Sequence, residues 1–434
     1  MSAPRRLVLN AFLKPPGEYL AAWRHPGARP DAGVSLGAFT DLARRAERAG
    51  FDAIFLADLV AVPLESPDVL SRVSVVNDAL EPLALLSALA ARTERIGLIA
   101  TASTTYHDPV DLARWFATLD HLSHGRAGWN VVTSLSDAEA LNHGLDAHPD
   151  HAGRYARAEE AVDVVRALWD AGATADRPAG RVRHHGEHLR VDTVPEVPRP
   201  PQGRPVLVQA GSSDAGRDLA ARTADVVFAG ETELGAAQEL YADLKGRAAA
   251  HGRDPDGLIV LPALSAVVAA TAEEARGRHE RLTALMPPQV ALADLAYRLG
   301  GHDLTAHPLD GPLPDLPAGS GSLTHHRQIY DAARRDGLTI RQLARRIGDD
   351  HRSIVGDVAT VADHVETWFR GGAADGFNVV FPVLPEALDA TAGLLLPELR
   401  RRGLLAPVPG DGKPAYGGTL RSRLGLLAPG APPA

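Results

Sequence analysis

Short apolar runs alternate with longer amphipathic segments along most of the chain. The runs are rich in Val, Ile, Leu and Phe, and the longer segments carry apolar residues at helical spacing. Such runs indicate buried strands, and the longer pattern indicates helices. The predicted strands are 7–12, 51–58, 96–103, 126–133, 204–211, 225–230, 258–269 and 377–381. The predicted helices are 36–50, 81–95, 109–122, 154–170, 214–224, 234–251, 272–286, 358–371 and 385–402.

Buried strands that alternate with helices are typical of parallel sheets. The predicted strands number eight, which is what a closed (β/α)8 barrel requires, so we predict an α/β fold of the TIM-barrel class. An open, doubly wound sheet is the alternative. It is disfavoured because no GxGxxG glycine pattern follows the first strand.

Four stretches interrupt the alternation, at 63–80, 134–153, 171–203 and 287–356. Three of them follow strands 2, 4 and 7, or the helix after strand 7, where barrel loops build active sites. We therefore expect residues 1–405 to form one barrel with these insertions. Residues 406–434 are rich in Gly and Pro, and we expect this tail to lie on the surface or to fray.

Composition removes several classes of function. The chain of 434 residues has no cysteine, which excludes disulfides, thiolate zinc sites, iron–sulfur clusters and cysteine nucleophiles. The formal net charge is −9 and the basic residues form no block, so we expect no nucleic-acid partner. No apolar run reaches the roughly 18 residues of a membrane span, so we expect a soluble, cytoplasmic protein without a membrane partner.

Polar residues close several of the predicted strands. In a parallel barrel these ends share one rim, so their side chains would converge there. Any one of them could instead cap a helix or a turn, as Asp, Ser, Thr and Asn often do. The rim candidates are Asp58, Thr101, Ser103, Thr104, Asn130, Thr133, Ser134, Gln209, Ser212, Ser213 and Asn378.

The segment 209–216 reads QAGSSDAG, a strand end followed by a glycine, two serines and the start of a helix. Backbone amides at a helix N-terminus, together with the hydroxyls of Ser212 and Ser213, would make a phosphate site. The alternative is a serine N-cap after a glycine turn. His151, Arg154 and Tyr155 begin the helix after strand 4 and could reach the same phosphate; otherwise they form a solvated helix end.

Metal and hydrolase chemistry have weak support. The chain has 18 histidines, and the stretch 184–188, HHGEH, has the composition of a zinc site. It falls in the insertion before strand 5, and no HExxH helix pattern occurs, so we predict no metal site. A GxSxG nucleophile elbow is also missing, which disfavours a Ser–His–Asp hydrolase.

Several longer motifs together identify a family. The chain resembles flavin-dependent monooxygenases of the bacterial-luciferase-like superfamily, in the group of nitrilotriacetate monooxygenase component A, dibenzothiophene-sulfone monooxygenase and long-chain alkane monooxygenase. The matching motifs are WRHP (23–26), FDAIFLAD (51–58), EPLALLSALAARTERIGL (81–98), ATASTTYHDP (100–109), LDHLSHGRAGWNVVTS (119–134), the segment 151–155, QAGSSDAGRDLAA (209–221), DLTAHPLDGPLP (303–314), ADGFNVV (374–380) and LPELRRRGL (396–404).

The resemblance implies a (β/α)8 barrel that binds reduced FMN, which reacts with O2 to give a C4a-hydroperoxide. It implies that Asp58, Thr101, Asn130 and Ser134 surround the isoalloxazine and ribityl chain. It also implies that His151, Tyr155, Ser212 and Ser213 surround the ribityl chain and phosphate. The insertion 287–356 would be the lid. A separate NAD(P)H:flavin reductase would supply the flavin, and a homo-oligomer, dimer or tetramer, would be expected.

The chain departs from this family where substrate specificity should be set. Several relatives carry a histidine before WRHP, whereas residues 13–20 here read LKPPGEYL, and the loop after Asp58 is short and apolar. No relative's substrate can therefore be copied onto this chain. Candidate pocket residues are Phe12, Tyr19, Trp23, Val60 and His302, with ordinary packing as the alternative for the apolar ones.

Two other functions remain open from the sequence. An F420-dependent oxidoreductase would share the barrel but transfer hydride instead of activating O2. A flavin-binding protein without oxygenase activity is supported only by the missing histidine in 13–20. The narrower motif match favours the FMN-dependent monooxygenase of a small organic substrate.

Overall fold

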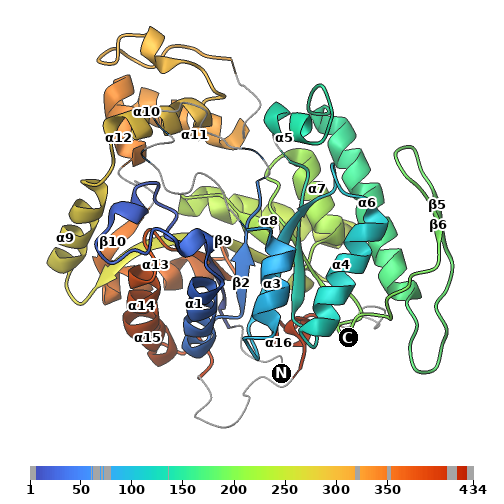
Figure 1. Ribbon diagram of the computed structural model, residues 1–434. Coiled ribbons are helices and arrows are strands. Elements are labelled where there is room, and N and C mark those ends of the chain that lie inside the picture. Colours follow the sequence, from blue (N-terminus) through green and yellow to red (C-terminus); the bar gives the residue numbers. More distant parts are fainter. Residues whose placement is uncertain are drawn as a thin grey trace.

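Parallel strands close into a barrel surrounded by helices in the computed structural model (Figure 1). The structure describes residues 6–59, 61, 69, 72, 80–134, 136–317, 323–348, 353–407 and 418–427. Strand β9 pairs with both β8 and β11, which closes the sheet and confirms the barrel over the open, doubly wound alternative. The eight barrel strands are β1 (Val8–Phe12), β2 (Ala53–Leu56), β3 (Gly97–Ser103), β4 (Ala127–Val132), β7 (Val206–Gln209), β8 (Val226–Ala229), β9 (Ile259–Ala269) and β11 (Gly376–Val380).

Each of these strands lies within two residues of a predicted range, and each predicted helix is present. The last predicted helix is divided, with a π-helical turn over Thr391–Leu395 between its two α-helical parts. The outer layer comprises α1 (Leu36–Ala49), α3 (Pro82–Ala90), α4 (Pro109–Leu122), α6 (His151–Ala171), α7 (Asp214–Thr223), α8 (Leu234–Ala250), α9 (Ala272–Thr283), α13 (Val358–Arg370), α14 (Glu386–Ala390) and α15 (Leu396–Arg401).

Two separate cores hold the barrel together. The larger lies between the sheet and the helices, where Phe116, Trp129 and Trp169 are fully buried. The smaller fills the barrel lumen and includes Phe55 and Val208. Side chains of one strand reach both cores because successive side chains in a strand point to opposite faces of the sheet.

The insertions form structure that the sequence did not predict. Strands β5 (Val182–His185) and β6 (Arg190–Thr193) form an antiparallel hairpin that projects from the side of the barrel (Figure 1). A short helix, α5 (Asp137–Asn142), follows β4. Strand β10 (Ile354–Asp357) pairs with the end of β9. Most of the insertion 63–80 lies outside the described residues.

The longest insertion forms a small helical unit above the barrel (Figure 1). Its helices are α10 (Pro288–Arg298), α11 (Leu323–Asp336) and α12 (Ile340–Gly348), which we call the insertion helices. They share a core of their own that includes Leu295, Tyr330 and Leu343. The insertion is therefore a packed unit over the rim, not an extended loop.

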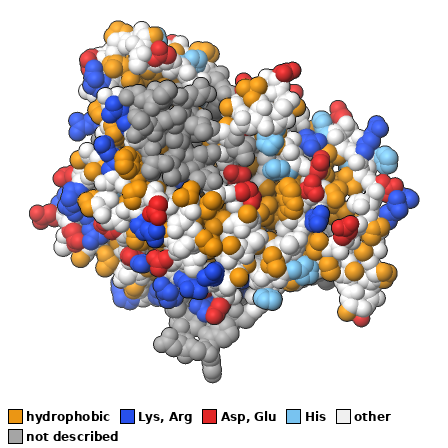
Figure 2. Space-filling view, in the orientation of Figure 1, with side chains coloured by type: hydrophobic (Ala, Val, Ile, Leu, Met, Phe, Trp, Pro, Cys, Tyr) orange, Lys and Arg blue, Asp and Glu red, His pale blue; other side chains and the backbone are white. Residues whose placement is uncertain are grey.

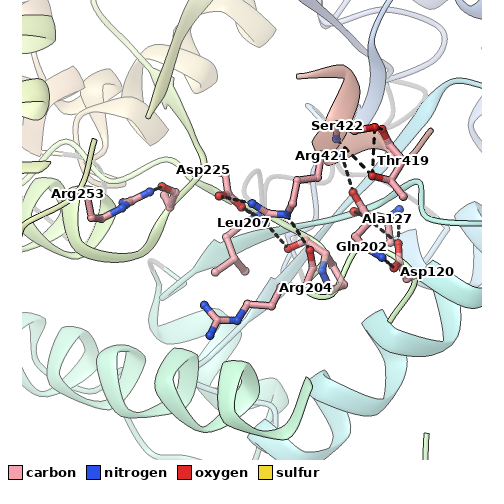
Figure 3. Close-up of polar contacts among 12 residues, drawn as sticks. Asp120, Ala127, Gln202, Arg204, Leu207, Asp225, Arg253, Thr419, Arg421 and Ser422 are labelled. Carbon is pink, nitrogen blue, oxygen red and sulfur yellow. Dashed lines mark hydrogen bonds and ion pairs between the residues drawn. The ribbon is translucent and has the colours of Figure 1, made fainter. Parts of the chain in front are cut away.

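The chain end closes the opposite, amino-terminal end of the barrel. Helix α16 (Leu420–Arg423) inserts Leu420, which is fully buried in the lumen core. Arg421 makes a buried ion pair with Asp225, with Nη1 2.9 Å from Oδ1 (Figure 3). The expectation that the tail lies on the surface is therefore wrong for Leu420 and Leu426, because their buried side chains belong to the lumen core.

Candidate functional site

Two polar side chains at the ends of β3 and β4 form a fixed pair on the rim. Thr101 Oγ1 donates to the Leu56 carbonyl at 2.9 Å and accepts from Asn130 Nδ2 at 2.9 Å. This arrangement fixes the amide orientation of Asn130. Its Oδ1 is buried and has no hydrogen-bond partner among the described residues. A buried acceptor without a donor needs an explanation, and a ligand donor at this point is one.

Ser134 follows β4 with a strained backbone. Its φ is +57°, in the left-handed region that non-glycine residues rarely adopt. Two contacts hold it there: its Oγ lies 3.0 Å from Ser103 Oγ, and its carbonyl accepts from Arg154 Nη1 at 2.5 Å. The strain is therefore maintained by neighbours on β3 and α6, and it directs this turn at the rim.

The N-termini of α6 and α7 converge through side chains beside the end of β7. Ser213 caps α7 by accepting from the Gly216 backbone N–H at 3.1 Å. Its Oγ lies 3.2 Å from Nε2 of His151, the first residue of α6. The His151 ring is 4.7 Å from the ring of Tyr155, centroid to centroid. Both helix ends favour negative charge here.

Two glycines give the backbone room to approach a ligand at the same place. A Cβ added to Gly211 would lie 2.8 Å from Tyr155 Oη, and one added to Gly216 would lie 2.9 Å from it. Side chains at these positions would displace the tyrosine hydroxyl. The sequence Gly-Ser-Ser-Asp-Ala-Gly therefore forms a turn that only small residues permit, with hydroxyl and amide donors at a helix start.

Asp58 follows β2 and is half-buried. Burial is the main cause that raises its pKa to about 6, and the negative charges of Glu81 and Glu139 raise it further. The backbone N–H of Leu59 opposes the shift. A carboxyl group with this pKa can hold or release a proton near neutral pH, which is the property of a general acid or base.

A cluster of aromatic and imidazole side chains lies beside this rim. Tyr106 shares a hydrogen bond of 2.7 Å with Nδ1 of His148, and its ring stacks on His143 at 4.3 Å. Burial and then the charge of Glu139 raise the pKa of Tyr106 to about 12, so this hydroxyl stays protonated. Figure 2 shows several histidine side chains on the half of the molecule that carries α4, α5 and α6.

A cavity of about 370 Å³ lies between the insertion helices and the loops that follow β1 and β8. Glu18, Tyr19 and Leu20 come from the first loop, and Glu231 to Ala236 come from the second. Its volume is within the range of roughly 300–1,000 Å³ that small-molecule sites occupy.

The comparisons with known proteins decide the family. Residues 18–375 match the model of the luciferase-like monooxygenase family. Nitrilotriacetate monooxygenase component A from Aminobacter aminovorans is 44% identical over 99% of this chain and 98% of its own length. N-acetyl-S-(2-succino)cysteine monooxygenase from Bacillus subtilis is 41% identical, again over 99% of this chain and 98% of its own length. The chain belongs to the luciferase-like monooxygenase family.

A solved structure agrees with this assignment. Riboflavin lyase, whose structure holds a modified FMN and riboflavin, has a TM-score of 0.84 and 29% identity, with 98% of this chain and 97% of that chain covered. The resemblance stated from the motifs is thereby confirmed. As a luciferase-like monooxygenase, the protein is an enzyme of the oxidoreductase class. None of its described helices is long and apolar enough to cross a membrane.

The structure brings most of the predicted cofactor residues of this luciferase-like monooxygenase to one rim. Thr101 bonds to Asn130, and His151 contacts Ser213 and packs against Tyr155. Ser134 lies at the end of the strand that carries Asn130, and Asp58 lies at the end of β2. Ser212 lies between Gly211 and the cap of α7.

The predicted pocket residues divide into two groups. Phe12 stacks on Phe55 at 5.4 Å and meets the Phe228 ring edge-on at 6.0 Å, which forms an aromatic floor at the top of the lumen. Tyr19 is buried, donates to the Thr283 carbonyl at 3.3 Å and lines the cavity.

The remaining pocket candidates have structural partners elsewhere or are not described. Trp23 Nε1 donates to the Arg72 carbonyl at 3.1 Å. His302 Nε2 donates to the Pro317 carbonyl at 2.9 Å within the insertion. Val60 lies outside the described residues.

The histidine-rich stretch 184–188 has a structural partner in α6. His184 Nε2 lies 3.0 Å from Glu160 Oε2, and Glu160 also accepts from three backbone N–H groups of the hairpin turn. Although burial opposes it, these hydrogen bonds lower the pKa of Glu160 to about 2. Among the described residues no group of three or more His, Asp or Glu is placed to hold a metal ion.

Sequence reasoning missed Glu139, Tyr106 and His148. Glu139 is almost fully buried and accepts from Ser136 in a capping box, and its charge acts on both Asp58 and Tyr106. The Ser-x-x-Glu spacing at 136–139 was the available signal. It predicts a helix start but not that the carboxylate faces the rim.

Proposed function

We propose that the protein is the oxygenase component of a two-component monooxygenase that uses reduced FMN and O2 on a small organic substrate. The observation that carries this proposal is the meeting of two helix N-termini at Ser213 and His151 on the same rim as the unsatisfied Asn130 Oδ1. An anion site next to a buried acceptor matches a phosphate at one end of a ligand and a donor group at the other.

The side chains on this rim fit both the phosphate end and the ring end of FMN. Ser212, Ser213, the first amides of α7, His151 and Tyr155 would hold the phosphate and the adjoining ribityl hydroxyls. Thr101, Asn130, Ser134 and Asp58 would lie around the rest of the ribityl chain and the ring. The chemistry that reduced FMN supplies when bound is the two-electron activation of O2.

The protein's own groups have three tasks in this proposal. The insertion helices cover the rim and would keep water out of the site, which limits side reactions with solvent while the bound flavin reacts with O2. Phe12, Phe55 and Phe228 give the ring an apolar floor. Asp58, whose pKa is about 6, holds a proton at its carboxyl group or accepts one there as substrate and flavin change charge.

A separate reductase completes the system. The relative from Aminobacter aminovorans is named as a component A, and no GxGxxG pattern for a nicotinamide dinucleotide follows the first strand. We therefore propose that an NAD(P)H:flavin reductase supplies the reduced FMN, and that the protein acts in the cytoplasm as a homo-oligomer.

Anaerobic binding tests the cofactor. We expect reduced FMN to bind at micromolar concentration or below in an anaerobic titration, and reduced F420 to bind at least about tenfold more weakly. Mixing the complex with O2 in a stopped-flow instrument should give flavin reoxidation that differs in rate from that of free reduced FMN. Tighter binding of F420, or no binding of FMN, would overturn the proposed function.

The pH dependence of stability tests the environment of Asp58. The folded pKa of about 6 is above the unfolded value of 3.8. The folded state therefore binds the extra proton between these values, and its stability contribution is complete below about pH 4 and lost as the pH rises through 6. The side chain introduced by Asp58→Asn does not ionise, so this variant does not lose that stability as the pH rises. The free energy of unfolding of the variant minus that of the wild type should therefore be about 1–2 kcal/mol larger at pH 8 than at pH 4, a figure reduced to allow for the partial exposure of Asp58.

Denaturant unfolding at the two pH values measures this difference. Asp146→Asn is the matched control because Asp146 is exposed and has no ion pair among the described residues. An equal change in the free energy of unfolding at both pH values for Asp58→Asn would show that the carboxyl group of Asp58 titrates normally.

A further inference from the structure

The cavity under the insertion helices has no function assigned by the cofactor proposal. Glu231 follows β8, and β8 pairs with β7, whose end leads to Ser212 and Ser213. Tyr19 and Leu20 follow β1 on the other side of the cavity. The cavity therefore lies above the carboxyl ends of β1 and β8, next to the strand that leads to the proposed phosphate residues.

One part of the cavity wall is apolar. Leu20, Met286, Leu343 and Ile347 line it together with the ring of Tyr19. Tyr19 is held in place by its hydrogen bond to the Thr283 carbonyl. Burial of a hydrocarbon or aromatic group against this wall would stabilise a complex through the hydrophobic effect.

The arginines of the cavity are partly neutralised by ion pairs. Arg298 Nε lies 2.9 Å from Asp294 Oδ2, and that carboxylate is almost fully buried. Arg335 Nε lies 3.1 Å from Asp336 Oδ1, and Arg346 bonds to the other oxygen of Asp336. Arg335 and Arg346 share the single carboxylate of Asp336, so the guanidinium groups of the cavity keep part of their positive charge.

The cavity also has carboxylates without such partners. Glu231, Glu233 and Asp331 line it and have no ion pair among the described residues. Glu18 adds a buried Oε2 without a hydrogen bond there, 3.7 Å from Lys14 Nζ. Burial raises the pKa of Glu231, and the positive charge of Arg217 opposes this shift without cancelling it. The lining thus has more negative than positive charge.

We propose that this cavity binds the organic substrate and selects an amine or another organic cation with an apolar body over a carboxylate. The inference rests on the proposed function for the identity of the reaction. A cation would pair with Glu231 and Asp331 and place its apolar part against Leu343 and Met286. An anionic substrate would instead meet a lining in which carboxylates outnumber guanidinium groups, so specificity comes from repulsion as well as attraction.

Three probe molecules that share one carbon skeleton and differ in charge test whether the cavity selects by charge. They are 4-phenylbutylamine, 4-phenylbutan-1-ol and 4-phenylbutyrate, which carry positive, zero and negative charge at pH 8. Calorimetric titration of the full-length protein should show the amine binding about tenfold more tightly than the carboxylate, with the alcohol between them. Raising the salt concentration should narrow the difference, because exposed charges are screened.

The double variant Glu231→Gln/Asp331→Asn should reduce the preference for the amine by about tenfold. Glu280→Gln is the matched control, since Glu280 is an exposed carboxylate on α9 that does not line the cavity, and it should leave the preference unchanged. The proposal is overturned if the carboxylate binds as tightly as the amine, if no probe binds at millimolar concentration, or if the double variant keeps the wild-type preference.

Reduced FMN binding on the same preparations separates this inference from the proposed function. Binding of FMN without a preference for the amine would overturn the cation pocket alone, whereas loss of both would overturn both. If the double variant does not fold, the order of the three probes on the wild type decides the question by itself.

Discussion

Replacing Ser213 by aspartate is expected to weaken the binding of reduced FMN by on the order of 100-fold. The helix itself should persist, because aspartate is as good an N-cap as serine and can accept from the Gly216 N–H in the same way. The added carboxylate, however, would face the flavin phosphate. Two unit charges 4 Å apart repel by about 4 kcal/mol at an effective dielectric constant of 20, and tenfold in affinity corresponds to about 1.4 kcal/mol.

A second serine N-cap gives the control for this prediction. Ser35 caps α1 by accepting from the Ala38 backbone N–H at 3.3 Å, on the outer layer of the barrel. Ser35→Asp makes the same chemical change and should leave FMN affinity unchanged. Both variants are compared by anaerobic titration with reduced FMN. Equal affinity of Ser213→Asp and the wild type would place the phosphate away from α7.

The barrel and the capped turn at 209–216 were predictable because their signals are local. A strand such as β2 is a continuous apolar run, AIFL, and its neighbours in the sheet are the strands before and after it along the chain, β1 and β3. The signal for the α7 cap likewise lies within 209–216, where the end of a strand is followed by a glycine, two serines and the start of a helix. Local order of this kind survives folding, so the resemblance and the residue-level interpretation agreed.

The cavity was not predictable, because its charges come from distant parts of the chain. Glu231 and Asp331 belong to different elements, and only the packing of the insertion helices over the rim brings them to one space. The same holds for Glu139, which a capping box positions but tertiary packing directs toward Asp58. No short sequence pattern predicts that side chains so far apart in the chain will come close together.

Helix α16 shows the same limit at the other end of the barrel. It belongs to the tail 406–434, whose richness in Gly and Pro is typical of a segment on the surface. The burial of Leu420 depends on Gly97, where a Cβ would lie 2.7 Å from the Leu420 side chain. The fit of this leucine is therefore set by a residue on β3, more than three hundred positions earlier in the chain.

Replacing Arg421 by methionine is expected to lower the free energy of unfolding by about 3–5 kcal/mol. Arg421 and Asp225 are both almost fully buried, and two hydrogen bonds of 2.9 and 2.5 Å join them (Figure 3). Without the guanidinium group, the carboxylate would be a buried charge that keeps one hydrogen bond, from the Leu207 backbone N–H at 2.9 Å, and the weaker electrostatic attraction of Arg253 and Arg166. Urea unfolding measures the change.

Arg401→Met is the matched control, because Arg401 makes an equally short ion pair with Glu398 while its own side chain is 73% exposed. That variant should lose at most about 1 kcal/mol. Adding Asp225→Asn to Arg421→Met should recover a large part of the loss, since it removes the unpaired charge. A loss for Arg421→Met no greater than that of the control would mean that the pair at the barrel's amino end contributes little.

The ion pair between Arg421 and Asp225 lies where we expect it to affect the stability of the fold but not the binding of the cofactor. In (β/α)8 barrels the catalytic groups lie at the carboxyl ends of the strands, and the opposite end serves stability. Arg421 lies at the opposite end, beside the start of β7, and it bonds to neither Asn130 nor Ser213. Arg421→Met should therefore bind reduced FMN with wild-type affinity at temperatures well below its melting point. Reduced affinity under those conditions would show that the closure of the amino end shapes the rim as well as stabilising the fold.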